Sequence, residues 1–212
     1  MQLRYSLLAL LALAPLTFAE AQTCLGSVAS AQAPGGRNIV VAGVADFVEG
    51  TNTLGGRVGF LRNAQPGRDI ALHLGVRSFS AGGTSVVSAD YQLAAEVRRS
   101  AERTRSTCVV LGIDAINLND ADNGFINMYF GPTYGRVIQQ GTTTLVPFGL
   151  AAANLSSAGE SETGEFSVFG EIGVGVRLNG GLTATGSVRR SFEDGAVNVL
   201  RILVAYPLGS AR

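Results

Sequence analysis

Apolar and polar side chains alternate with a period of two along most of the chain beyond Asn38. In segment 69–79 the even positions from Ile70 to Val76 are large and apolar, whereas the odd positions are polar or small. Segments 86–98 and 166–178 repeat the pattern, and in the second of them only Phe169 falls on the wrong face. Because a strand turns successive side chains to opposite faces, these segments predict strands with one oily and one polar face.

Seven less regular segments complete a predicted set of ten strands. The predicted strands are 39–49, 54–62, 69–79, 86–98, 108–116, 125–137, 145–154, 166–178, 182–192 and 197–208. Turns rich in glycine, asparagine and aspartate lie between many of them, as hairpins require. A meander without covering helices removes its open edges by closing on itself or by folding into two sheets. We expect an all-β protein, a closed antiparallel up-and-down barrel of ten strands, with eight strands if two irregular segments merge.

The amino terminus has the features of an export signal. Met1 to Arg4 carry one positive charge, and a short apolar run follows from Leu7 to Leu16. Such a run is too short to span a bilayer. We expect a signal peptide over 1–21, a mobile lead over 22–37 and a single barrel domain over 38–212. The alternatives are a first helix kept in the mature fold and a lipoprotein acylated at Cys24.

Composition narrows the class of protein. The chain is 46% hydrophobic and 15% charged, contains 28 glycines, and has no second apolar run long enough for a transmembrane helix. Sixteen arginines balance sixteen acids, so no basic stripe predicts a nucleic acid partner. The remaining question is which face of the barrel carries the charge.

We expect the polar face to line the lumen and the oily face to meet lipid. The polar face is rich in glycine and serine and bears charges of both signs, which suits a narrow interior of stacked ion pairs. The segments also have the length of about ten residues that a tilted strand needs to cross the apolar band. The alternative is a soluble lipocalin-like barrel with its oily face turned inward around an apolar ligand. The proposed lumen network consists of Asp46, Arg57, His73, Arg77, Asp90, Glu96, Asp114, Glu171, Arg177, Arg189 and Arg201.

Aromatic side chains for the two membrane interfaces are sparse. Aromatic residues make up 7% of the chain, and none is tryptophan. Interfacial aromatics anchor membrane barrels at the headgroup level. Here the girdles would rest on Tyr91, Phe130, Tyr134, Phe148, Phe166, Phe192 and Tyr206.

The closing stretches 166–178, 182–190 and 198–206 combine a glycine-alternating strand, a tight turn and an arginine-bearing strand before a last strand with Tyr206 near its end. In this the chain resembles the small outer-membrane β-barrels of the OmpA and OmpX type, over about Asn38 to Leu208. The resemblance implies a bacterial outer-membrane location, a lipid bilayer partner, insertion by the barrel-assembly machinery and a monomer. That family usually ends on an aromatic residue, whereas here Pro207 to Arg212 follow Tyr206.

The two cysteines are expected on the same side of the barrel. Cys24 lies in the lead and Cys108 at the periplasmic start of the fifth strand. An oxidising periplasm would permit a disulfide between them. The alternative is two separate buried thiols.

No catalytic, cofactor or metal motif stands out. His73 is the only histidine, so any serine triad, including one in a lipid-trimming esterase, would run through it. Its place on the polar face of a strand favours a lumen residue. The Asp120 to Asn123 region lacks the distal glutamate of a calcium loop and reads as a turn. We therefore predict a non-enzymatic barrel without metal or cofactor, with a structural envelope role or a pore for small solutes.

Overall fold

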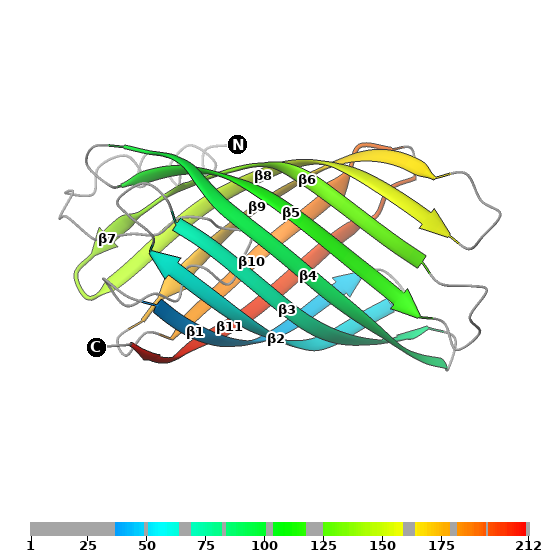
Figure 1. Ribbon diagram of the computed structural model, residues 1–212, viewed down its shortest axis with the longest axis horizontal. Coiled ribbons are helices and arrows are strands. Elements are labelled where there is room, and N and C mark those ends of the chain that lie inside the picture. Colours follow the sequence, from blue (N-terminus) through cyan, green and yellow to red (C-terminus); the bar gives the residue numbers. More distant parts are fainter. Residues whose placement is uncertain are drawn as a thin grey trace, which may run out of the picture.

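The chain forms a closed antiparallel β-barrel (Figure 1). The computed structural model describes residues 37–48, 51–63, 69–81, 84–100, 104–117, 125–158, 164–178, 182–193 and 195–210. Their strands are β1 (Arg37–Val48), β2 (Thr51–Asn63), β3 (Asp69–Ala81), β4 (Thr84–Arg99), β5 (Arg105–Asn117), β6 (Phe125–Arg136), β7 (Ile138–Gln140), β8 (Thr143–Ala158), β9 (Glu165–Arg177), β10 (Thr183–Ser191) and β11 (Asn198–Ser210). No helix in this described part is long and apolar enough to cross a membrane.

The barrel has ten strands because β6 and β7 together make one of them. β7 follows β6 after Val137, and both pair with β8. Each other strand pairs with its neighbour in sequence, and β1 pairs with β11 to close the ring. The predicted ten-stranded meander is confirmed, and the eight-stranded alternative is wrong.

A local hydrogen bond accompanies the interruption between β6 and β7. The backbone N–H of Val137 donates to the carbonyl oxygen of Thr104 at 2.8 Å, in the connection before β5. The hairpin from β7 to β8 turns at Gly141, whose φ of 59° lies in the region that favours glycine and suits a primed turn. Neither feature was predicted from the sequence, since the predicted strand 125–137 ended at the interruption and β7 was not predicted.

The two ends of the barrel are distinguished by the first and the last strand. We call the end where β1 begins and β11 finishes the terminal end, and the opposite one the far end. The β8–β9 and β9–β10 connections lie at opposite ends, as the predicted topology requires. The proposed signal peptide and most of the lead, residues 1–36, lie outside the described residues.

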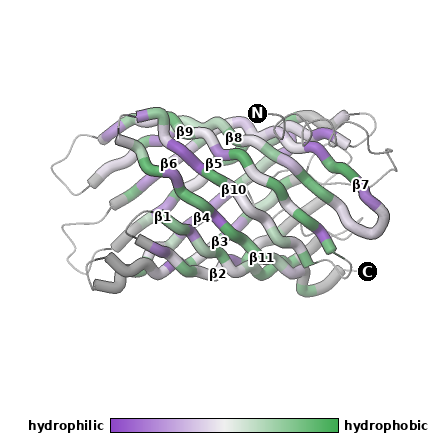
Figure 2. The backbone as a smooth tube through the Cα atoms, turned by 180° about the vertical axis from the view of Figure 1, so that it is seen from behind, coloured by the Kyte–Doolittle hydropathy of each residue, from purple (hydrophilic) through white to green (hydrophobic). Residues whose placement is uncertain are grey.

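The apolar face of the sheet points outward. Leu54, Val76, Ile172 and Phe166 are 57–71% exposed, whereas charged residues such as Asp46 and Glu171 are buried inside. Figure 2 shows apolar and polar residues alternating along the strands. The lipocalin-like alternative, with the oily face inward, is therefore wrong.

Polar side chains border the apolar outer face at both ends. Between these borders the described outward positions, apart from Thr107, are apolar residues, glycine or proline, which together form what we call the apolar band. The bordering residues are Asn52, Ser78, Ser157, Arg190 and Asn198 at the far end, and Arg105, Arg136 and Gln140 at the terminal end.

Two phenylalanines lie inside the barrel, one of which was expected in the outer belt. Phe148 is 7% exposed and packs inside with Val137 and Val146, so its predicted place at a membrane interface is wrong. Phe169, the ring that broke the sequence alternation, also lies inside, in edge-to-face contact with Tyr129 at 5.6 Å between centroids. The described outer aromatics include Phe130, Tyr134, Phe166, Phe192 and Tyr206.

Apolar side chains fill much of the lumen toward the terminal end. They come from the parts of their strands nearer that end, where buried polar residues such as Ser106 and Thr183 lie among them, whereas the middle and the far-end side hold most of the buried charges together with Phe169. These apolar residues are Val40, Ala71, Ala94, Cys108, Val110, Val146 and Phe148.

Candidate functional site in the barrel lumen

A buried ion pair joins the first and the last strand inside the barrel. Asp46 of β1 lies opposite Arg201 of β11 in the register of the closing strand pair. The guanidinium of Arg201 donates from Nε to Asp46 Oδ1 at 2.6 Å and from Nη2 to Oδ2 at 2.9 Å. This two-point geometry is the strong form of an arginine–carboxylate pair.

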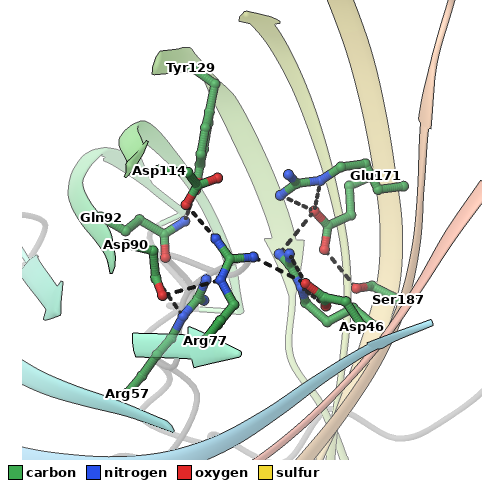
Figure 3. A network of polar contacts seen from close by, with 11 residues as sticks. Asp46, Arg57, Arg77, Asp90, Gln92, Asp114, Tyr129, Glu171 and Ser187 are labelled. Atoms are coloured by element: carbon green, nitrogen blue, oxygen red, sulfur yellow. Dashed lines mark hydrogen bonds and ion pairs between the residues drawn. The ribbon is translucent and has the colours of Figure 1, made fainter. Parts of the chain in front are cut away.

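Arg77 of β3 connects three carboxylates (Figure 3). Its Nη1 lies 3.2 Å from Asp46 Oδ2, its Nε 3.4 Å from Asp90 Oδ1, and its Nη2 2.5 Å from Asp114 Oδ1. Arg57 of β2 adds a second cation on Asp90, with Nε 2.7 Å from Oδ2. Side chains from the five neighbouring strands β1 to β5 thereby meet in one cluster.

Glu171 of β9 is the acid on the other side of the lumen. Its Oε1 accepts a hydrogen bond from Ser187 Oγ at 2.6 Å, and its Oε2 accepts from Nε and Nη2 of Arg189 at 3.0 and 2.9 Å. Nη1 of Arg201 lies 3.9 Å from the same oxygen. Arg201 therefore joins the Glu171 group to the Asp46 group.

Aromatic rings complete the network. The guanidinium carbon of Arg189 lies 4.4 Å from the ring centroid of Phe169 and 5.4 Å from that of Tyr129, within the range of cation–π attraction. The Tyr129 hydroxyl accepts a hydrogen bond from Gln92 Nε2 at 3.0 Å. Phe169, which interrupts the alternation in the sequence, therefore contacts the Arg189 cation inside the barrel.

Lumen glycines make room for these long side chains. A Cβ added at Gly112 would collide with the ring of Tyr129, which lies directly opposite on β6. One at Gly75 would meet both Asp90 and Arg57, and one at Gly55 would meet the stem of Arg77. These glycines on the polar face therefore leave the space that the long side chains of the network occupy.

The network is neutral and largely buried. It contains four acids, Asp46, Asp90, Asp114 and Glu171, and four arginines, Arg57, Arg77, Arg189 and Arg201. None of these eight side chains is more than 17% exposed. A balanced, mutually paired set provides no surplus charge for selecting an ion, whereas pores that select by charge use rings of one sign.

Three residues of the predicted network lie apart from it. His73 is fully buried beside Gly59, and neither ring nitrogen has a hydrogen-bond partner among the described residues. Glu96 accepts a hydrogen bond from Ser106 Oγ at 2.6 Å nearer the terminal end. Arg177 is half-buried at the terminal end of β9. The structure places the other eight predicted charges in the network described above.

Sequence reasoning missed the uncharged members of the network. The hydroxyls of Tyr129 and Ser187 and the amide of Gln92 take part, and all three residues sit on the polar face of their strands. Their place on the lumen-facing side of the strand was therefore the signal that the sequence offered. That signal does not distinguish these three residues from other polar residues on the same face.

Cys108 is buried and disulfide-bonded. Cys24, its predicted partner, lies outside the described residues, so the pairing itself stays a prediction. The turn at Asp120 to Asn123 also lies outside them, and among the described residues no group of three or more acids, histidines or cysteines is placed to hold a metal.

Comparisons with known proteins assign no family. No family model and no curated protein matches the chain. The translocator domain of the autotransporter NalP from Neisseria meningitidis aligns with a TM-score of 0.47 and 13% identity, over 82% of this chain and 89% of that one. The outer membrane enzyme PagL aligns at 0.44 and 11%, over 80% and 99%, and Ail of Yersinia pestis at 0.40 and 11%, over 81% and 97%. The resemblance to the OmpA and OmpX type therefore stays a prediction.

Proposed function

We propose that this chain is a bacterial outer-membrane β-barrel with a closed lumen, which serves the envelope as a structural component and does not conduct solutes. The observation that carries the proposal is the apolar band between two polar borders, with the charges inside. In water such a band would expose far more contiguous apolar surface than soluble monomers do. A closed barrel is one of the two architectures that satisfy every backbone group within a bilayer.

The closed lumen is the reason to prefer a structural role over a pore. The buried ion pairs lie in the middle and the far-end side of the lumen and link strands on both sides of the seam between β1 and β11, and buried apolar side chains such as Val40 and Phe148 lie toward the terminal end. A solute would have to break buried ion pairs and then cross an apolar layer. Both steps are costly.

Fractionation of cells that express the full chain tests the location. We expect recovery in the outer-membrane fraction, as a band whose electrophoretic mobility changes on boiling. Recovery as a soluble periplasmic monomer would refute the membrane proposal. Depletion of the barrel-assembly machinery, the partner that we expect to insert the chain, should reduce the folded band.

Conductance tests the closed lumen separately. The purified barrel should give no stable conductance steps in a planar bilayer in which a large porin, added as a reference, conducts. Stable steps from the folded barrel would show an open pore and would leave the membrane location intact.

A non-enzymatic role is part of the proposal. His73 is the only histidine and is buried inside the barrel, so a lipid outside cannot reach its ring. We expect no lipid deacylation by the folded barrel in mixed micelles. Deacylation that His73→Ala abolishes while the boiling-sensitive band persists would contradict this part.

A further inference from the structure

The outer surface over β8 to β11 contains a groove of about 850 Å³. Its lining includes Leu145 of β8, Ile172 and Val174 of β9, Gly186 and Val188 of β10, and Leu200 of β11. Ile172, Val174, Val188 and Leu200 are 41–71% exposed, so this groove opens to the outside of the barrel.

Gly186 creates the depth of the groove. It lies between Val174 and Ile202 in the register of its two strand pairs. A Cβ added there would meet no other heavy atom within 4 Å, so the missing side chain leaves open space. A residue with a side chain at this position would fill the depression.

The polarity of the groove changes along its length. The lining within the apolar band is mostly aliphatic, with Phe148 bordering it from a lumen-facing position, and Gln140, at the polar border of the terminal end, adds an amide there. Ser187 also borders the groove, but its hydroxyl donates inward to Glu171. The groove is thus apolar inside the band and polar at the border.

We propose that this groove binds one acyl chain of a membrane lipid, with the lipid headgroup near Gln140. The inference rests on the membrane location proposed above, because only there does the groove face acyl chains. A phospholipid changes from an apolar acyl chain to a polar headgroup along its length, as the groove changes from apolar residues to Gln140. The volume lies within the range of pockets that enclose a small ligand. A concave apolar site also gives a chain more packing contacts than the convex wall around it.

Native mass spectrometry tests the proposal. The full chain is reconstituted in vesicles of phosphatidylethanolamine and phosphatidylcholine, extracted in mild detergent and weighed. We expect the wild-type barrel to retain a phospholipid and Gly186→Leu to lose it, because the new side chain fills the groove. Gly56→Leu is the matched control, since Gly56 is another outward glycine with no heavy atom closer than 3.8 Å to an added Cβ. It should retain the lipid.

Other outcomes overturn the proposal. Equal retention by all three proteins, or retention by none, would show that the groove has no preference for lipid over the rest of the wall. A dimer of the wild type that Gly186→Leu dissociates would place a second copy in the groove. Boiling-sensitive mobility is recorded for each protein, so that failure of the wild type to form a membrane barrel counts against the proposed function instead. If Gly186→Leu does not fold, Gly186→Val replaces it, because valine favours strands.

Discussion

Replacing Asp46 with asparagine tests whether the buried network stabilises the barrel. The change keeps the size of the side chain and removes one of four negative charges. Of the two contacts at 2.6 and 2.9 Å, Arg201 then keeps at most one, to the neutral amide oxygen, while the amide N–H replaces the other acceptor; its next carboxylate, Glu171, is 3.9 Å away. Arg77 loses less, because Asp114 at 2.5 Å and Asp90 at 3.4 Å remain.

The expected cost follows from leaving the Arg201 guanidinium buried without a close carboxylate. Removing one member of a buried ion pair typically costs about 3–5 kcal/mol. We expect Asp46→Asn to lower the free energy of unfolding by this amount. The measurement is urea unfolding of the barrel in detergent micelles, followed by the fraction of protein that keeps boiling-sensitive mobility.

A double variant separates the ion pair from general damage. Asp46→Asn combined with Arg201→Met removes both partners and leaves three acids with three arginines. Because replacing a whole buried pair is often nearly neutral, the double variant should recover most of the lost stability. The reasoning is refuted if Asp46→Asn unfolds within about 0.5 kcal/mol of the wild type, the range of ordinary surface changes, or if the double variant is no more stable than the single one.

Three further predictions concern other parts of the barrel. Gly112→Val should cost about 1–3 kcal/mol through overpacking because it meets the ring opposite, whereas Gly43→Val, which has open space outside, should be nearly neutral in the same unfolding assay. Val174→Arg in the apolar band should cost about 2–4 kcal/mol in a bilayer near its midplane; Ser78→Arg at the far-end border is the control and should cost far less. Cys108→Ser should lower stability by a few kcal/mol, and reducing agent should then have no additional effect, which gel mobility with and without reductant checks.

The sequence predicted the fold well because both faces of each strand have a strict chemical requirement. A slip of one residue would exchange the outward apolar face and the lumen face, so the alternation is strong in the middle of strands such as β3 and β9. Strand ends lack this constraint. β5 accordingly begins at Arg105 and not at Cys108, and the interruption at Val137 could not be seen.

The sequence predicted which residues face the lumen, but not which of them contact one another. Alternation places Arg77 and Asp114 on the lumen side, yet only the ring of strands brings them together from β3 and β5. Aromatic residues were the weakest point, because Phe148 and Phe169 look equally suited to lipid or to a crowded lumen. Their inward position depends on clearance at Gly173 for Phe148 and on the Arg189 guanidinium for Phe169.

The Asp46–Arg201 pair also bears on how the barrel closes. Its two residues are 155 positions apart, whereas the other strand pairs join neighbours in sequence. The hairpins can therefore form from local contacts, but the seam between β1 and β11 has to wait for the whole chain. Until the seam closes, Arg201 on the edge strand has no Asp46 beside it, and in the membrane location that we propose, a charge without its close partner is expensive. Partly closed sheets are thus penalised twice, by open backbone groups and by separated charges, which makes closure of the ring a cooperative, late step of folding.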